Sequence, residues 1–435
     1  MKIAVVGVGH VGLVTAATLA KMGHEVVGLD DDDRKIEGLN QGKLPFFEPG
    51  LKELIEEVTA AGRLRFSQDP ADAIAGATVA FSCVGTPSRA DGEANLLAVE
   101  KAAESVGKHA TGDIVFVQKS TVPIHTADRV QAMLRRISKH RFYLVSNPEF
   151  LKEGSAVEDS LHPDRLLVGA DMPEAHEIMR SVYEPLMNQN VTYFATDIKT
   201  AELAKHACNA FLALKISFAN ALAQICDASG ADVCSVADIM GSDPRIGRAF
   251  LNAGLGYGGY CFPKDVAAFK VQAARFGYEF DLLDDVIKIN QQALQSAFRK
   301  VNDVLWNIEG KRIVLLGLAF KALTDDVRES PSLYLAKLLI DAGAEVIGYD
   351  PQANQAARAQ LPELQVVDDL YEAAEGAHCL VIATEWPEFA DLDLSRLKGI
   401  MTHPIIVDAR NILDPQLVAE AGFTYLPTGR PPVNL

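Results

Sequence analysis

The chain has 435 residues, of which 49% are hydrophobic and 23% are charged, a balance typical of globular proteins in solution. This length indicates about three domains rather than one core. The formal net charge of −17 argues against nucleic acid or an anionic membrane as the main partner.

The sequence also lacks obvious targeting and metal-binding patterns. No stretch approaches the roughly 20 apolar residues that span a bilayer, and the first residues read as a strand rather than a signal peptide. Six cysteines are scattered without a CxxC pair, so we expect no metal site. A reducing, cytoplasmic setting fits this cysteine usage best.

The amino-terminal segment carries the pattern of a dinucleotide-binding unit. A short apolar run leads into Gly7, Gly9 and Gly12, then a helical pattern, then a second strand that ends in Asp30. The glycines permit a tight turn, close approach of a pyrophosphate, and packing of the helix on the strand. Asp30 is expected to bond the ribose hydroxyls and to repel a 2′-phosphate, which favours NAD over NADP. The alternative is a tight turn in some other α/β unit.

Three further strands are predicted at residues 77–83, 114–117 and 142–145, and a polar turn follows each of them. Ligands of open parallel sheets bind outside the carboxyl ends of the strands. The three turns together therefore indicate a lined cleft. They span residues 84–87, 119–123 and 146–153.

A long pattern without proline or glycine runs from Thr200 to about Ser229 and predicts one helix, either connecting two domains or forming a dimer. Lys205 and Asn209 are four residues apart, so both point to the same side of that helix. A polar pair among Ala, Leu, Phe and Ile neighbours indicates a ligand or a partner.

The stretch around Cys261 is the strongest candidate for chemistry. Three glycines at 256, 258 and 259 precede the cysteine, and Pro263 and Lys264 follow it before a helical pattern. We expect Cys261 to lie just ahead of a helix N-terminus with Pro263 at the first helical position, where the helix dipole and the lysine favour a thiolate. The alternative is a buried structural cysteine behind a glycine turn.

The carboxyl-terminal part repeats the first unit. Residues 311–317 and 341–350 mirror the first strand with its turn and the second strand of the amino-terminal segment. The altered turn contains Lys321, and Arg328 follows in an insert, so this unit is expected to hold a different phosphorylated ligand. The tail from 427 to 435, rich in Pro and Gly, is expected to be loose.

These patterns predict an α/β protein with two Rossmann-like doubly wound domains joined by a long central helix. The expected domains are an NAD-binding domain at 1–199, a helical region with the catalytic cysteine and dimer contacts at 200–298, and a second ligand-binding domain at 299–435. A cysteine beside a nicotinamide indicates aldehyde-level chemistry, with a thiohemiacetal that loses hydride and a thioester that is hydrolysed.

The chain resembles the nucleotide-sugar 6-dehydrogenase family from Gly7 to Arg410. The resemblance implies oxidation of a sugar C6 alcohol to a carboxylate with two NAD per substrate, in a homodimer or higher homo-oligomer. It is nearest to members that act on UDP-glucose. The motifs that carry it are Ser120–Pro123, Asn147–Leu151, Lys205 with Asn209, Gly258–Asp265 and Arg328–Ser330.

Several alternatives remain open. GDP-mannose, TDP-glucose and UDP-N-acetylmannosamine are possible substrates within the family, although Phe262 and the intact Asn147–Leu151 motif favour UDP-glucose. A β-hydroxyacid dehydrogenase would lack both the cysteine and the second Rossmann unit. An NAD-sensing binding protein would leave the set of polar residues around Cys261 unexplained. Tyr260 departs from the serine of many members, which bears on the shape of the site.

By this resemblance Cys261 is the nucleophile, Lys205 steadies the oxyanion or takes part in proton transfer, and Asn209 shares that oxyanion. In hydrolysis Glu149 would be the base, and Asp265 and Thr121 would hold the water.

The resemblance also implies two sets of binding residues. The residues expected to contact NAD are Gly7, Gly9, Val11, Gly12, Asp30, Lys35, Thr86, Thr121, Glu153, Lys264 and Arg328. The residues expected to contact the sugar nucleotide are Glu149, Phe150, Leu151, Lys152, Lys205, Asn209, Phe250, Leu251, Asn252, Ala253, Gly254, Gly258, Lys321 and Arg410, with Arg245 reaching into the neighbouring subunit's site.

Overall fold

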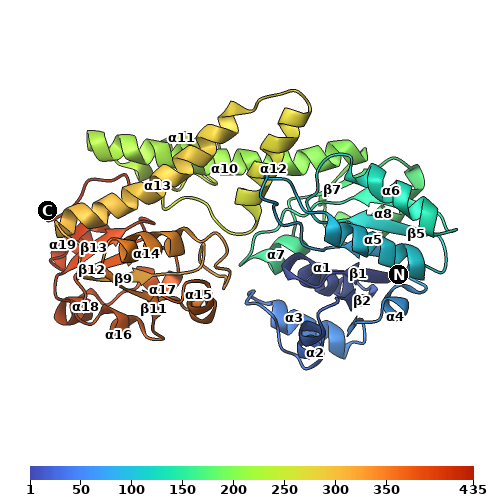
Figure 1. The fold of residues 1–435 in the computed structure, drawn as a ribbon, viewed down its shortest axis with the longest axis horizontal. Helices are drawn as coiled ribbons and strands as arrows, with labels where there is room; N and C mark the ends of the chain where they lie inside the picture. Colours follow the sequence, from blue (N-terminus) through green and yellow to red (C-terminus); the bar gives the residue numbers. More distant parts are fainter. The chain divides into compact units, whose positions relative to one another are not determined.

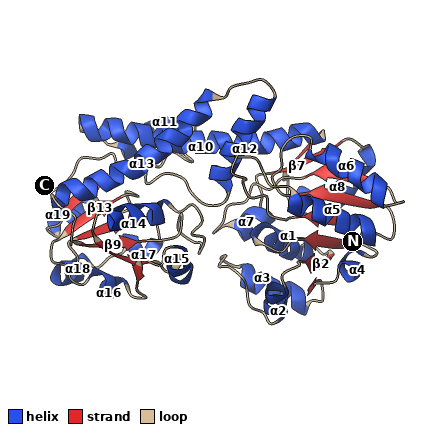
Figure 2. Cartoon of the chain, viewed as in Figure 1, coloured by secondary structure: helices blue, strands red, loops and turns tan.

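The computed structural model describes residues 1–435 and contains two sheets, each with helices on both faces (Figures 1 and 2). The chain divides into two compact units. The first comprises residues 1–208 with 267–278, and the second comprises residues 209–266 with 279–435.

The first unit holds a sheet in the order β3-β2-β1-β4-β5-β6-β7-β8, whose neighbours are parallel except β6 and β7. The first six strands follow the order 3-2-1-4-5-6 of dinucleotide-binding folds. The strands are β1 (Lys2–Val6), β2 (Glu25–Leu29), β3 (Leu64–Ser67), β4 (Val79–Ser82), β5 (Ile114–Gln118), β6 (Phe142–Ser146), β7 (Arg165–Ala170) and β8 (Thr192–Thr196).

Helices cover both faces of this sheet because successive side chains of a buried strand point to opposite faces. Ile3 and Val5 join a core with helices α1, α3, α7 and α8, whereas Ala4 and Val6 join a core with α4, α5 and α6. The helices are α1 (His10–Lys21), α2 (Asp33–Asn40), α3 (Leu51–Ala60), α4 (Pro70–Ile74), α5 (Leu97–His109), α6 (Thr126–Ile137), α7 (Ala156–Leu161), α8 (Pro173–Val182) and α9 (Glu184–Met187).

The second unit holds a fully parallel sheet in the order β11-β10-β9-β12-β13-β14, again 3-2-1-4-5-6. Its strands are β9 (Arg312–Leu316), β10 (Glu345–Tyr349), β11 (Gln365–Val366), β12 (Cys379–Ile382), β13 (Ile405–Asp408) and β14 (Thr424–Pro427). The prediction of two doubly wound sheets is therefore confirmed.

The remaining helices include two that pass from one unit to the other. These are α10 and α12, whereas α13 and α14 pack in the core of the second sheet. The bounds are α10 (Ile198–Ser229), α11 (Val233–Gly241), α12 (Cys261–Arg275), α13 (Asp281–Leu305), α14 (Pro331–Asp341), α15 (Asn354–Gln360), α16 (Leu370–Ala374), α17 (Pro387–Ala390), α18 (Leu394–Ile400) and α19 (Pro415–Glu420).

Helix α10 confirms the predicted long helix and has 32 residues. By length and composition alone it could cross a membrane, in contrast to the expectation from the sequence. One such helix is weak support for a membrane protein, because the core helix of a soluble protein passes the same test. Its buried side chains include Glu202 and Lys205, which are costly inside a bilayer.

The internal repeat extends to individual hydrogen bonds. Gly7 N donates to Leu29 O, and Gly317 N donates to Tyr349 O, each at 2.7 Å. The acid after the second strand then accepts the next backbone N–H. Asp30 Oδ2 accepts from Val8 N at 2.8 Å, and Asp350 Oδ2 accepts from Leu318 N at 2.7 Å. Both sheets therefore present the same turn at the carboxyl end of their central strand.

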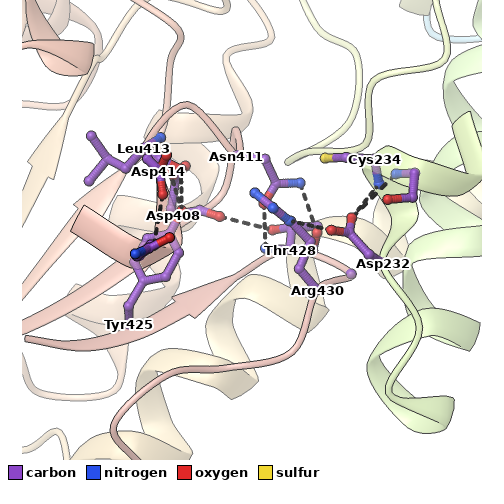
Figure 3. Close-up of polar contacts among 12 residues, drawn as sticks. Asp232, Cys234, Asp408, Asn411, Leu413, Asp414, Tyr425, Thr428 and Arg430 are labelled. Atoms are coloured by element: carbon purple, nitrogen blue, oxygen red, sulfur yellow. Dashed lines mark hydrogen bonds and ion pairs between the residues drawn. The ribbon is translucent and has the colours of Figure 1, made fainter. Parts of the chain in front are cut away.

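The expectation of a loose tail is wrong, because the residues after β14 are bonded at several points (Figure 3). Thr428 N donates to Asn411 Oδ1 at 3.0 Å, and Asn411 Nδ2 donates to Thr428 O at 2.8 Å. Arg430 Nε lies 3.2 Å from Asp232 Oδ2, and Val433 pairs with Tyr425 in an antiparallel bridge. The tail is therefore ordered despite its proline and glycine content.

Burial of Glu202 leads to a pH-dependent prediction. Its carboxylate accepts the backbone N–H of His125 at 3.0 Å, and burial raises the pKa of Glu202 from 4.5 to about 8. Between these values the folded state holds a proton that the unfolded chain releases, so this group's contribution to stability falls as pH rises. Glu202→Gln removes that titration. The free energy of unfolding of the variant, relative to wild type, should rise from pH 5 to pH 8 in chemical denaturation.

Glu174, an exposed glutamate of the same unit, supplies the matched control. Glu174→Gln is expected to follow the wild-type pH dependence. A Glu202→Gln variant that also follows the wild type would contradict the assignment of a protonated Glu202.

Candidate active site

The glycine turn after β1 fits a dinucleotide on an observation independent of its sequence pattern. A Cβ on Gly9 would meet no atom within 4 Å, whereas a Cβ on Gly12 would lie 1.8 Å from Gly7 O. Helix α1 begins without a side-chain cap and without an acidic residue in its first turn. Its backbone N–H groups are therefore available to a pyrophosphate, and Gly9 leaves room for it.

Asp30 lies directly beside this turn. Its Oδ2 accepts from Val8 N and lies 2.9 Å from Lys35 Nζ, while its Oδ1 accepts from Asp32 N at 3.2 Å. The structure thus brings two predicted NAD contacts, Asp30 and Lys35, into one ion pair.

The loops after β4 and β5 are tied to each other. Thr86 Oγ1 donates to Thr121 O at 3.0 Å, and Ser120 Oγ donates to Val84 O at 2.6 Å. Thr86 and Thr121 are therefore neighbours at the carboxyl edge of the sheet, as the sequence predicted from their positions after strands.

The loop after β6 brings Glu149 to the first part of α10. Lys205 Nζ lies 3.1 Å from Glu149 Oε1, and both side chains are buried. Leu151 N donates to Glu149 Oε2 at 2.8 Å, and Lys205 Nζ lies 5.2 Å from the centroid of the Phe150 ring. A buried lysine and carboxylate in contact form a site at which a proton can move.

The sequence analysis missed Glu48, a buried glutamate that contacts the starts of helices α1 and α7. Glu48 accepts from Gly154 N and Ala156 N, each at 2.8 Å, and its Oε2 lies 2.9 Å from His10 Nε2. It thereby joins the start of α1 to the segment that contains Glu153. The available signal was a single acid in the apolar stretch around Phe46.

Farther out, Lys152 is exposed and lies 3.5 Å from Asp159 Oδ1. Val11 is half-buried on α1 and packs against the core. Neither residue is drawn into the Lys205–Glu149 pair by a hydrogen bond.

In the second unit, the start of α12 gathers four of the predicted residues. Asn209 Nδ2 donates to Asp265 Oδ2 at 2.6 Å, and Lys264 Nζ donates to Asp265 Oδ1 at 2.5 Å. Cys261 is the first residue of α12, one turn before Asp265. The expectation that it precedes the helix is therefore wrong, because the helix begins two residues earlier than expected. Pro263 is the third helical residue rather than the first, and a backbone N–H is still not required there.

Lys264 is a cation that interacts with both Asp265 and Cys261. Burial lowers the pKa of Lys264, but the charges of Asp265 and of a Cys261 thiolate outweigh burial and raise that pKa above its ordinary value. Cys261 therefore lies at a helix N-terminus beside a lysine ammonium that it shares with the Asp265 carboxylate.

Tyr260 holds a second predicted cofactor contact near the cysteine. The Arg328 guanidinium lies 4.3 Å from the centroid of the Tyr260 ring, and Lys264 Nζ lies 5.2 Å from it. Asp326 binds the same guanidinium, with Nε at 2.9 Å from Oδ1. The departure from serine at position 260 therefore adds an aromatic face for two cations.

The predicted sugar-nucleotide loop lies at the carboxyl edge of the second sheet. A Cβ on Gly254 would lie 2.9 Å from Ala409 O and 3.1 Å from Arg410 Nη1, and a Cβ on Gly258 would lie 2.2 Å from Glu329 O. Arg410 Nε donates to Ala383 O at 2.7 Å. The glycines thus allow the loop to approach this edge, where a ligand of a doubly wound sheet binds.

Other members of that set have different environments. Leu251 and Ala253 are buried, Asn252 Oδ1 accepts from Arg248 Nη1 at 2.7 Å, and Phe250 contacts Phe262 edge to face. Lys321 Nζ lies 5.7 Å from the centroid of the Phe320 ring.

Arg245 has an exposed side chain, and its Nη2 lies 2.6 Å from Asp243 Oδ2. Its reach into another subunit stays a prediction.

Comparison with known proteins covers nearly the whole chain. Residues 1–187 match the NAD binding domain of the UDP-glucose/GDP-mannose dehydrogenase family, residues 199–292 match its central domain, and residues 314–415 match its UDP binding domain. The chain is 45% identical to the UDP-glucose 6-dehydrogenase of Rhizobium meliloti, over 99% of this chain and 100% of that protein.

Solved structures give the same picture. A UDP-glucose dehydrogenase from Pyrobaculum islandicum has a TM-score of 0.92 at 36% identity and covers 99% of this chain and 98% of its own. A UDP-D-ManNAc dehydrogenase from Pyrococcus horikoshii has a TM-score of 0.87 at 28% identity and covers 99% of both chains.

The stacking on Tyr260 supports a prediction about NAD. Tyr260→Ser removes the aromatic face that holds Arg328, a predicted NAD contact, and is expected to raise KM for NAD about threefold to tenfold, corresponding to a cation–π contact of about 1 kcal/mol. Tyr260→Phe keeps the ring and should stay near wild type. Steady-state rates at varied NAD test both variants, and equal KM values for the serine and phenylalanine variants would contradict a role for the ring.

Proposed function

The chain belongs to the UDP-glucose/GDP-mannose dehydrogenase family, and on this premise we propose that it oxidises UDP-glucose at C6 to UDP-glucuronate with two NAD. The observation that carries the choice of substrate is the 45% identity, over the whole chain, to a UDP-glucose 6-dehydrogenase. The sequence identity to the UDP-D-ManNAc dehydrogenase is lower, at 28%. GDP-mannose, TDP-glucose and UDP-N-acetylmannosamine are the competing substrates.

Different domains bind the two ligands. Residues 1–199 bind NAD, residues 200–298 supply the catalytic cysteine and subunit contacts, and residues 299–435 bind the sugar nucleotide. NAD, when bound, accepts a hydride in each oxidation. The glycine turn, Asp30 and Lys35 hold it, together with Val11, Thr86, Thr121, Glu153, Lys264 and Arg328.

In the first oxidation, the C6 hydroxyl must lose its proton and the resulting oxygen must be stabilised. Lys205 and Asn209 supply these functions from α10, one turn apart. Lys205 is held 3.1 Å from Glu149, and this carboxylate keeps the ammonium in place and can exchange a proton with it.

The second oxidation needs a nucleophile, because an aldehyde has no hydroxyl from which hydride loss can begin. The Cys261 thiolate forms an S–C bond to the aldehyde carbon, and the carbonyl oxygen becomes the oxyanion of a thiohemiacetal. Loss of hydride leaves a thioester. Asn209 and Lys205 stabilise the oxyanion, and Lys264 stabilises the thiolate.

Hydrolysis then breaks the C–S bond. Glu149 takes a proton from water, the resulting hydroxide adds to the thioester carbon, and the cysteine sulfur leaves as a thiolate. Asp265 and Thr121 hold the water. Asp265 is suited to this task because Asn209 and Lys264 fix both of its oxygens.

We also propose a homodimer or higher homo-oligomer in the cytoplasm. Phe211, Phe218 and Ile225 are exposed on α10 at intervals of seven residues, so they form one apolar stripe that a second copy can cover. Arg245 then reaches into the neighbouring subunit's site.

Cys261→Ala tests the covalent mechanism. The variant should fold and bind NAD, because the glycine turn after β1 is unchanged, but it should form no UDP-glucuronate. The wild type should release two NADH per UDP-glucuronate and no free aldehyde. Product analysis and NADH absorbance are measured for the variant and the wild type. A normal yield of UDP-glucuronate from the variant would remove the cysteine from the mechanism.

Lys321→Ala tests the ligand assigned to the second sheet. Loss of this ammonium from the altered turn should raise the Kd for UDP-glucose about tenfold and leave the Kd for NAD nearly unchanged, as for loss of one charge-assisted phosphate contact. Lys337→Ala is the matched control, because Lys337 is paired with Asp341 and Glu363 on the exposed side of α14. Loss of NAD binding by Lys321→Ala would reverse the ligand assignment.

A further inference from the structure

The glycine-rich loop ahead of Cys261 is buried although it has no regular structure. Residues 253–259 are buried and belong to no helix or strand. Phe250, near the start of the loop, has a left-handed backbone with a φ of 65°, which is uncommon for a residue other than glycine. A buried backbone N–H outside helices and sheets still needs an acceptor. The groups that accept these bonds therefore determine where the predicted sugar-nucleotide contacts of the loop lie.

Asn220 of α10 supplies one of these acceptors. Gly254 N donates to Asn220 Oδ1 at 2.8 Å, and Asn220 is only 2% exposed. On its other side Gly254 lies against the second sheet, since a Cβ on Gly254 would lie 2.9 Å from Ala409 O. The loop is thus fixed between α10 and the carboxyl edge of the sheet, at a residue that is predicted to contact the sugar nucleotide.

Asn290 of α13 supplies the next acceptor along the loop. Its Oδ1 accepts from Tyr257 N at 2.7 Å, and its Nδ2 donates to Tyr257 O at 3.0 Å. The carboxamide therefore pairs with both backbone groups of Tyr257, as a residue of a neighbouring strand would. Gly256 has a φ of 102°, and a Cβ there would lie 2.5 Å from Asn290 Oδ1, so glycine permits this approach. Tyr257 directly precedes Gly258, another predicted sugar-nucleotide contact.

The two carboxamides differ in how many of their atoms are bonded. Asn290 uses both its oxygen and its nitrogen, whereas Asn220 Nδ2 has no hydrogen-bond partner. Asn220 instead lines a small cavity together with Asp227 and Lys300. Only the oxygen of Asn220 therefore holds the loop, whereas both polar atoms of Asn290 do.

We propose that Asn220 and Asn290 are positioning residues that hold the Phe250–Gly259 loop in the conformation that binds the sugar nucleotide. The inference rests on the proposed function, which assigns this loop to UDP-glucose. Replacement by aspartate distinguishes the two positions. Aspartate at position 220 keeps the oxygen that accepts from Gly254 N, whereas aspartate at position 290 places a second oxygen opposite Tyr257 O.

Variants of Asn220 test the first contact. Asn220→Ala removes the acceptor and should raise the Kd and the KM for UDP-glucose about threefold to tenfold, as for the loss of one hydrogen bond. Asn220→Asp should bind UDP-glucose nearly as the wild type does. The KM for NAD should stay unchanged in both variants, because the glycine turn after β1 is not altered. Calorimetry gives the Kd, and NADH absorbance gives the KM values.

Two results for Asn220 overturn the inference. One is a wild-type Kd for UDP-glucose in Asn220→Ala. The other is a Kd in Asn220→Asp that is as weak as that of Asn220→Ala, because the oxygen would then not be the group that holds the loop. A purely structural role would lower kcat without changing the Kd, and this result also counts against the inference.

Variants of Asn290 test the second contact and cover the case in which the buried Asn220 cannot be replaced without unfolding. Asn290 is half-buried, and both Asn290→Ala and Asn290→Asp should weaken UDP-glucose binding about tenfold. Asn302 on the same helix is the matched control, because it is also half-buried and its side chain donates to the neighbouring Asp303. Asn302→Asp should bind as the wild type does, and a wild-type Kd in Asn290→Asp overturns the inference.

Assays of the wild type separate this inference from the proposed function. The wild type is tested with UDP-glucose, GDP-mannose, TDP-glucose and UDP-N-acetylmannosamine, and the variants are then measured with the sugar nucleotide that it oxidises. Oxidation of none of the four overturns the proposed function and the inference with it. Oxidation of UDP-glucose by the wild type, with an unchanged Kd in every variant, overturns the inference alone.

Discussion

The hydrogen bond from the glycine turn to the acid after the second strand is the constraint on which both sheets depend. Val8 N donates to Asp30, and Leu318 N donates to Asp350. The bond closes the turn against the second strand, so the start of the following helix faces the carboxyl edge of the sheet. Every predicted ligand contact in the two sheets is placed relative to that edge.

The equivalent acids of the two sheets, Asp30 and Asp350, have different further partners. Asp30 also pairs with Lys35 and is expected to meet a ribose, whereas Asp350 also accepts from Ala319 N and from the indole of Trp386. Asp350 is thus engaged by its own turn and by Trp386. This difference explains in physical terms how one repeated architecture can be specialised for a dinucleotide in one sheet and for another ligand in the other.

Buried charge marks the candidate site within each unit. In the first unit Lys205 is paired with Glu149, and in the second unit Asp265 is shared by Asn209 and Lys264. Pairing offsets part of the cost of burial, and the low local dielectric strengthens each interaction. Chemistry that creates and removes an oxyanion and a thiolate benefits from charges held in this way.

Local sequence patterns determined much of this protein. The fingerprint from Gly7 to Asp30, the repeat at Gly317, the long helix and the glycine-rich approach to Cys261 all follow from spacing and periodicity within short stretches, and the structure confirms these elements. Backbone preference and side-chain alternation act over a few residues, which is why a sequence without its fold reveals them.

The tertiary structure alone decided which distant groups meet. Asn209 and Asp265 are 56 residues apart and share a hydrogen bond, and Glu48 reaches Gly154 across 106 residues. The bonded tail was likewise invisible, since proline and glycine usually indicate exposed chain. Burial and pairing are properties of the packed chain, because the partners of a polar group depend on long-range contacts that local spacing does not encode.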